Sequence, residues 1–253
     1  MDLGLKSKRA IVTGGTRGIG RAIVTLLAAE GCDVGFCARD ATQVAEAAKA
    51  LSGDGATVIG GVADVTDSAG LRVWITETAD AMGGLDILIA NASALGDKAD
   101  EDAWRTSLEV DILGTVRAVE AALPYLETSD AASITAIAST AAVNTPGNVR
   151  AYNGAKAALI SYLSGLSTNL GRKGIRANSV SPGAVYFEGG VWEQRKRETP
   201  EVYEATIKRS PMGRMCTPEE VANAVVFLAS PAASFVSGTN LIVDGGSTTR
   251  VQY

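Results

Sequence analysis

The feature that most constrains this chain is the stretch Thr13–Gly20, which has glycines at positions 14, 15, 18 and 20. An apolar run over 10–12 precedes it, and apolar residues at 19, 23, 26 and 27 follow with helical spacing. The glycines therefore lie in a strand-to-helix turn, where the missing Cβ atoms let the backbone approach a ligand closely. The N–H groups and dipole of the first helical turn favour an anion, and a phosphate fits best. The pattern predicts a nucleotide site.

The rest of the chain alternates apolar strand patterns with helical patterns. All seven prolines stand at or after Pro124, so the first half can alternate without interruption. Strands are expected near 9–13, 33–38, 56–61, 85–90, 132–138, 176–180 and 240–243. Helices are expected near 18–30, 41–52, 67–82, 101–127, 150–172 and 217–229. This order predicts an α/β chain, 1–253, that folds as a single Rossmann-type domain with a doubly wound, parallel seven-stranded sheet and helices on both faces.

Composition excludes several function classes. The chain has 253 residues, 46% of them hydrophobic, and a net charge of −5, which disfavours nucleic acid and anionic membranes as partners. It has no apolar run of membrane-spanning length and its N-terminus lacks a signal-peptide core, so a cytoplasmic location is expected. Cys32, Cys37 and Cys216 lack metal-site spacing and are expected to be reduced thiols. The absence of histidine excludes histidine triads and histidine zinc sites, and no metal is expected.

A second motif follows the predicted strand 132–138. Tyr152 and Lys156 are four residues apart on a predicted helix and so share one face, and Ser139 stands thirteen residues before Tyr152 at the strand end. With the spacing Thr-Gly-x-x-x-Gly-x-Gly at 13–20, the chain resembles the short-chain dehydrogenase/reductase family from about residue 5 to 250. A phenol has a pKa of about 10, which a neighbouring ammonium and an oxidised nicotinamide lower. The resemblance implies that Tyr152 is the acid/base, Ser139 polarises the carbonyl, and Lys156 favours the phenolate and holds the nicotinamide ribose.

The cofactor is expected to be NADP(H). The predicted second strand ends at Ala38 and Arg39, where an acidic residue would hold the ribose hydroxyls of NAD. Arg39 and Arg17 instead suit a 2′-phosphate. The remaining cofactor-binding residues implied by the resemblance are Gly14, Thr16, Gly18, Ile19, Asp64, Val65, Asn91, Tyr152, Lys156, Gly183 and Val185. For Asp64 the alternative is a role near a helix N-cap, and for Asn91 it is ordering of the strand ends.

Three positions depart from the family pattern. Asp111 stands where the family has the Asn of its proton relay, and it is either a catalytic-site residue or a helix-surface carboxylate. Ser93 replaces a Gly after Asn91. Phe187 replaces a Thr that contacts the nicotinamide amide, four residues after Gly183.

The resemblance places a substrate lid at about 186–212. This segment holds Tyr186, Phe187, Trp192 and Tyr203, which either pack under the lid or line a hydrophobic substrate pocket. The expected function is hydride transfer between NADP(H) and a small ketone or secondary alcohol, in a homotetramer. The alternative is a non-catalytic NADP-sensing or interaction protein on the same fold.

Overall fold

The computed structural model describes residues 2–51, 56–96, 98–144 and 149–249. Seven strands form one sheet in the order β3-β2-β1-β4-β5-β6-β7, and every neighbouring pair is parallel. The strands are β1 (Arg9–Thr13), β2 (Asp33–Ala38), β3 (Val58–Val62), β4 (Ile87–Ala90), β5 (Ser133–Ile137), β6 (Arg176–Pro182) and β7 (Asn240–Val243). The predicted doubly wound Rossmann sheet is confirmed.

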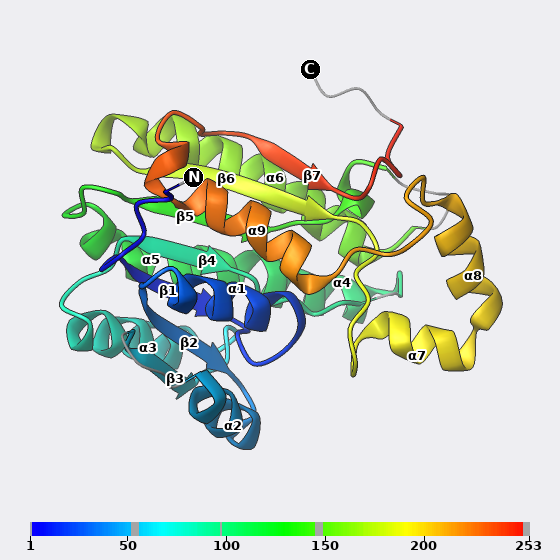
Figure 1. The fold of residues 1–253 in the computed structure, drawn as a ribbon, viewed down its shortest axis with the longest axis horizontal. Helices are drawn as coiled ribbons and strands as arrows, with labels where there is room; N and C mark the ends of the chain where they lie inside the picture. Colours follow the sequence, from blue (N-terminus) through cyan, green and yellow to red (C-terminus); the bar gives the residue numbers. More distant parts are fainter. Residues whose placement is uncertain (1, 52–55, 97, 145–148, 250–253) are drawn as a thin grey trace.

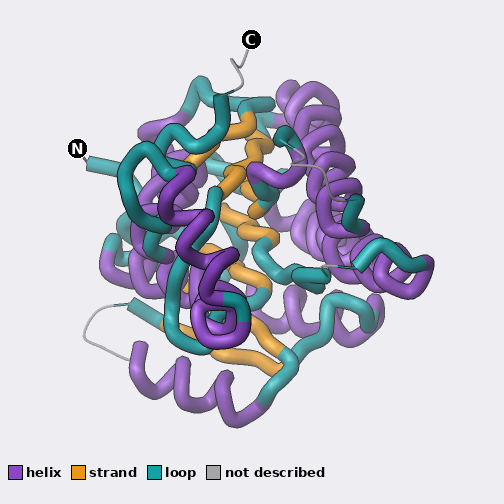
Figure 2. Tube along the Cα trace, turned by 90° about the vertical axis from the view of Figure 1, so that its right-hand side faces the viewer, coloured by secondary structure: helices purple, strands orange, loops and turns teal. Residues whose placement is uncertain are grey.

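Helices cover both faces of this sheet, as Figure 2 shows in a view turned by 90°. They are α1 (Gly18–Ala29), α2 (Ala41–Leu51), α3 (Ser68–Ala81), α4 (Glu101–Ser107), α5 (Gly114–Leu126), α6 (Ala151–Leu170), α7 (Val191–Glu198), α8 (Pro200–Arg209) and α9 (Pro218–Ala229). Helix α1 packs on α9 over one face, and α3 packs on α5 over the other. Strands covered on both faces tend to be continuous apolar runs, and Ala10, Ile11 and Val12 of β1 are fully buried.

The topology fixes where a ligand can bind. The chain order reverses between β1 and β4, so the loops after these two strands run in opposite directions, and sheets of this kind bind ligands outside the carboxyl ends of such strands. Figure 1 shows α7 and α8 beyond this edge, set off from the layers that cover the sheet.

The helix predicted near 101–127 is present and contains a π-helical turn. Residues 101–126 form α4, then a π-helical segment at Leu108–Leu113, then α5, in which Pro124 lies. The helical pattern of the sequence did not predict the π-helical turn. A π-helical turn carries an extra residue, and its cost is offset by tertiary contacts that a helical pattern does not reveal. None of the described helices has the length and apolar character needed to cross a membrane.

Candidate active site

The glycine-rich turn joins β1 to α1 in a conformation that requires glycine. Gly14 and Gly18 have φ angles of +72° and +53°, in the left-handed region. A Cβ on Gly20 would collide with the Gly14 carbonyl oxygen. The N–H groups of Gly14 and Gly15 donate to the Cys37 carbonyl at 2.8 and 3.1 Å, which ties the turn to β2. The turn therefore presents a preformed cradle at the start of α1, and Ile19 packs beneath it against the core.

Asn91 ties the end of β4 to the same turn. Its side-chain amide donates to the carbonyl oxygens of Thr13 (3.0 Å) and Gly14 (2.9 Å), while the Thr13 hydroxyl accepts from the Asn91 N–H at 3.1 Å. Of the two roles considered for Asn91, these contacts support ordering of the strand ends at the switch point.

Cys37 contacts the glycine-rich turn through its backbone carbonyl and not through its thiol. Burial raises the pKa of the Cys37 thiol to about 12, so the sulfur stays protonated at neutral pH. Cys32 and Cys216 are also free thiols, and burial raises their pKa values to about 12 and about 11. These environments do not favour a cysteine nucleophile.

Polar side chains surround the end of β2, where the adenosine of a dinucleotide is expected. Arg39 is exposed. The Arg17 guanidinium donates to the Gly189 carbonyl at 3.3 Å, and the Thr16 hydroxyl donates to Gln43 Oε1 at 3.3 Å. Sequence reasoning missed Gln43, which enters this region from α2. Arg17 thus stands at the start of α1 and Arg39 directly after β2, and Arg17 also contacts the segment after β6.

Asp64 follows β3 and is partly buried. Its Oδ1 accepts from the N–H and the hydroxyl of Thr66, both at 2.9 Å. Burial opposes ionisation, but these hydrogen bonds and the charge of Arg39 outweigh it and lower the pKa of Asp64. The N-cap of α3 is Asp67, which accepts from the Gly70 N–H at 3.0 Å. Asp64 therefore does not cap the helix.

Val65 follows Asp64, is buried, and packs against Gly114 directly after the π-helical segment. Its carbonyl accepts from Arg117 at 3.2 Å, and a Cβ on Gly114 would lie 2.9 Å from its side chain. Val65 thus fixes how the chain after β3 packs on α5.

Tyr152, Lys156 and Ser139 gather at the carboxyl edge of β5. Tyr152 and Lys156 lie in the first turns of α6, and the Lys156 ammonium is 5.7 Å from the centroid of the Tyr152 ring. Lys156 is buried and donates to the Ile137 carbonyl at 2.8 Å. Ser139 follows β5, is half-buried, and accepts from the Ala141 N–H at 3.1 Å. An ammonium, a phenol and a hydroxyl therefore share one strand end, as the resemblance implied.

The sequence left two alternatives open for Asp111, a catalytic-site residue or a helix-surface carboxylate. Its side chain is fully buried, so the helix-surface alternative was wrong. Oδ1 forms an ion pair with the Lys156 ammonium at 2.9 Å, and Oδ2 accepts from the Ala94 N–H at 3.2 Å. Asp111 lies within the π-helical segment, and Leu113, two residues further on, is exposed. The segment therefore directs a carboxylate inward onto Lys156.

The segment after β6 lies across the glycine turn. Gly183 donates to the Val243 carbonyl at 2.9 Å, and Val185 is buried and bridges to Cys216. The Phe187 ring then lies over Gly18, where an added Cβ would be 2.5 Å from its Cζ. Sequence reasoning found that Phe187 departs from the family pattern but did not foresee this contact.

The other aromatic residues of the segment 186–212 pack with one another and with cations. Tyr186 and Tyr203 meet edge to face at 6.0 Å, and the Lys196 ammonium lies 5.6 and 5.5 Å from their rings. The Arg195 guanidinium lies 4.8 Å from the Trp192 ring. Of the two alternatives for these aromatics, the contacts support packing within the segment.

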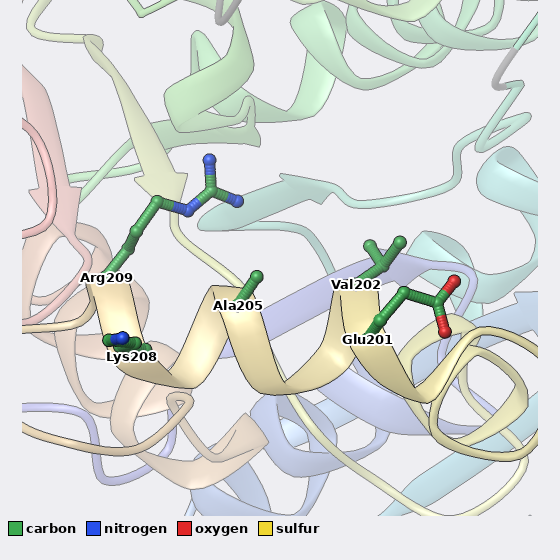
Figure 3. Close-up of a pocket in the computed structure, with 5 residues that line it drawn as sticks. All are labelled: Glu201, Val202, Ala205, Lys208 and Arg209. Atoms are coloured by element: carbon green, nitrogen blue, oxygen red, sulfur yellow. The ribbon is translucent and has the colours of Figure 1, made fainter.

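A groove of about 630 Å³ runs along α8. Figure 3 shows Val202, Ala205 and Arg209 on one side of this helix, while Glu201 and Lys208 project in other directions. The described residues hold no cluster of metal-binding side chains.

Comparison with known proteins decides the family. The family model described as enoyl-(acyl carrier protein) reductase matches residues 14–248, nearly the whole chain. The chain belongs to the short-chain dehydrogenase/reductase family. Isoepoxydon dehydrogenase patN of Penicillium expansum is 40% identical over 100% of this chain and 99% of its own. The 2-(S)-hydroxypropyl-CoM dehydrogenase 3 of Xanthobacter autotrophicus is 34% identical over 96% of this chain and 98% of its own.

Solved structures of this family agree. The structure of gox2181 superposes with a TM-score of 0.91 at 32% identity and covers 98% of both chains. A short-chain dehydrogenase from Burkholderia cenocepacia in complex with NADP has a TM-score of 0.86 at 31% identity, over 96% of this chain and 99% of the other. This short-chain dehydrogenase/reductase therefore belongs among oxidoreductases that act on CH–OH groups with a nicotinamide cofactor.

Proposed function

We propose that this short-chain dehydrogenase/reductase is a single-domain, NADP(H)-dependent enzyme that interconverts a small ketone and a secondary alcohol. The observation that carries the proposal is the grouping of Tyr152, Lys156 and Ser139 at one strand end, with Lys156 buried and fixed at 2.8 Å from the Ile137 carbonyl. Asp111 pairs with this buried ammonium, and a buried ion pair adds little net stability, so its presence beside a phenol suits a catalytic role.

Each residue has a distinct task in this proposal. Tyr152 exchanges a proton with the substrate oxygen. The Ser139 hydroxyl donates to that oxygen as negative charge develops on it. Lys156 favours the phenolate by its charge and also holds the nicotinamide ribose. The bound cofactor supplies or accepts the hydride.

The cradle around the glycine turn fits a dinucleotide. The left-handed backbone at Gly14 and Gly18 exposes N–H groups at the start of α1, and side chains at Gly18 and Gly20 would fill the space. Thr16, Ile19 and Asn91 shape this cradle. Asp64 and Val65 are proposed to face the adenine, and Gly183 and Val185 the nicotinamide amide. Arg17 and Arg39, with Ala38 in place of a carboxylate, support NADP(H) over NAD(H).

The segment 186–212, which includes α7 and α8, is proposed as the lid over a small-molecule substrate. Its groove along α8 combines apolar Val202 and Ala205 with charged Arg209. The three cysteines are free thiols, which supports a cytoplasmic location. The proposed assembly is a homotetramer, supported by the exposed small residues Ala157, Ala158 and Gly165 on α6.

The deciding experiment is a substrate panel with the purified chain. Ketones, 3-oxoacyl thioesters, sugars and steroids are incubated with NADPH or NADH, and absorbance of the reduced cofactor is followed. The proposal expects turnover of at least one ketone with NADPH as the preferred donor. Cofactor binding without turnover of any panel member would favour the non-catalytic sensing alternative.

A further inference from the structure

The groove along α8 lies at the carboxyl edge of the sheet, where Tyr152, Lys156 and Ser139 also gather. Tyr203 of α8 packs edge to face on Tyr186, which follows β6, with the ring centroids 6.0 Å apart. Beyond the other end of α8, Met212 packs against Gly245, which follows β7, and a Cβ on Gly245 would be 3.2 Å from the Met212 Sδ. Helix α8 is therefore anchored beside the ends of β6 and β7, and Figure 1 shows it beyond this edge.

One face of α8 is apolar and ends in a cation. Val202, Ala205 and Arg209 follow one another at intervals of three and four residues, so they share one side of the helix, as Figure 3 shows. Val202 is 40% exposed, and Ala205 and Arg209 are also exposed. Val202 and Arg209 are two turns apart, which is about 10 Å along the helix axis. The face thus offers a small molecule an apolar surface with a guanidinium at one end.

The Arg209 guanidinium has no acidic partner in the part of the chain that the structure describes. It donates to the Thr206 hydroxyl, one turn earlier, at 3.4 Å. Other cations of this region are engaged: the Lys196 ammonium lies over two tyrosine rings, and Arg214 pairs with Glu220 at 2.6 Å. The charge of Arg209 is therefore available to an anionic ligand.

The helix dipole accounts for only part of this arrangement. Cations are favoured near the end of a helix, and Lys208 and Arg209 both stand in the last turn of α8. The dipole does not distinguish the two residues, yet Arg209 lies on the side of Val202 and Ala205 while Lys208 projects in another direction. Lys208 is for this reason a matched control for Arg209.

We propose that this face of α8 is a substrate subsite in which Arg209 binds a carboxylate, so that the substrate is an oxo acid or the corresponding hydroxy acid. The proposal rests on the proposed function, because it names the substrate class of that same site. A planar guanidinium pairs with a carboxylate through two parallel hydrogen bonds. Val202 and Ala205 cover the apolar part of the substrate. One guanidinium, with Glu201 at the other end of the groove, suits a single negative charge better than a phosphate.

The test compares carboxylates with uncharged esters of similar shape. Levulinate, 5-oxohexanoate and 6-oxoheptanoate are each assayed beside the methyl ester at saturating NADPH, so that spacers of three lengths are sampled. For the wild type, kcat/KM is expected to be about tenfold or more higher for the best acid than for its ester. In Arg209→Gln this acid-to-ester ratio should fall to near one. The fall should arise from a higher KM for the acid, because the contact is made equally before and during the reaction.

Lys208→Gln removes the same charge from the neighbouring position of α8 and should keep the wild-type ratio. Arg209→Lys keeps the charge without the paired hydrogen bonds and should retain part of the preference for the acid. The proposal is overturned by a wild-type ratio near one for all three acids or by an unchanged ratio in Arg209→Gln. Equal falls in Lys208→Gln and Arg209→Gln also overturn it, because they would show a diffuse effect of surface charge.

Binding separates this proposal from the proposed function. Calorimetry gives the Kd of each acid for the protein with NADP⁺ bound, with no need for turnover. A Kd that rises about tenfold in Arg209→Gln but not in Lys208→Gln supports the subsite. If the same protein reduces no ketone, ester or acid, the subsite stands and the proposed function is contradicted. Turnover of the esters without preference for the acids, or no measurable binding of any of the three acids, contradicts the subsite instead.

Discussion

The Phe187 ring lies directly over Gly18, so close that a Cβ at Gly18 would be 2.5 Å from its Cζ. Phe187 comes from the segment after β6, and Gly18 begins α1. Because the start of α1 is where a cofactor phosphate is proposed to bind, the ring covers part of the proposed site, and we expect it to shift on cofactor binding.

Replacement of Phe187 by Thr should therefore tighten NADPH binding. The smaller side chain uncovers Gly18 and restores the family's hydroxyl, and we expect the Kd to fall about fivefold, or about 1 kcal/mol. Fluorescence titration with NADPH measures the Kd of the variant and of the wild type. Tyr203→Phe, which keeps a ring elsewhere in the lid, serves as the control. A weaker Kd in Phe187→Thr would show that the ring supports the cofactor instead of covering its site.

Tyr152→Phe should abolish turnover while NADPH binding persists, since the lost hydroxyl is needed for proton transfer. The expected loss is about 10²–10⁴-fold in kcat. Tyr162→Phe, on the same helix but packed toward the core, should keep near-normal rates. Retention of more than about a tenth of the rate in Tyr152→Phe would exclude it as the acid/base.

Arg39→Leu should raise the KM for NADPH about tenfold or more, because a charge-assisted hydrogen bond to the 2′-phosphate is lost. Ala38→Asp added to it should improve the use of NADH by offering a carboxylate to the ribose hydroxyl. Arg17→Leu should act in the same direction as Arg39→Leu. Arg105→Leu, which removes an exposed arginine on α4, is the control. Steady-state kinetics gives the ratio of kcat/KM with NADPH to kcat/KM with NADH. An unchanged ratio in Arg39→Leu would refute this assignment.

A bulky residue at position 165 should break the proposed tetramer. Gly165 and Gly171 are exposed and an added Cβ on either meets no atom within 4 Å, so a side chain can extend into solvent from both positions in a single chain. Gly165→Arg, in the middle of α6, should obstruct a close helix–helix contact, whereas Gly171→Arg, after its end, should not. Light scattering is expected to give four times the 26.0 kDa chain mass for wild type and Gly171→Arg and less for Gly165→Arg. A monomer mass for the wild type would refute the proposed tetramer.

The Arg9–Asp86 pair should make stability depend on pH. Burial of Asp86 opposes its ionisation, but hydrogen bonds from Arg9 and Ser129 outweigh it, and the pKa of Asp86 is lowered. A carboxyl with a lowered folded pKa stabilises the protein above its unfolded pKa of about 4, and this stability is lost as pH falls through the folded value. Asp86→Asn should cost about 1–3 kcal/mol at neutral pH and less in acid. Thermal unfolding of the wild type and of Asp86→Asn at neutral and at acid pH measures this difference in stability. An equal loss of stability at the two pH values would contradict the prediction.

The sequence by itself determined the fold and the main chemical groups. Apolar runs of strand length and the 3.6-residue helical spacing arise within each element, so the alternating strands and helices could be predicted before any contact was known. The glycine turn is equally local, because its φ angles depend on residues next to one another. Tyr152 and Lys156 share a helix face through their spacing alone.

The tertiary structure decided what surrounds these groups. The partner of Asp111, the contacts of Asn91 and the place of Phe187 each depend on segments that are distant in sequence and meet at one edge of the sheet. The π-helical turn within 101–126 is also a tertiary result, because its cost is offset by packing against elements that a local pattern does not reveal. The ionic partner of a buried charge cannot be predicted from neighbouring residues in the sequence. It depends on which elements pack together, and the sequence pattern does not give the distance between side chains on different elements.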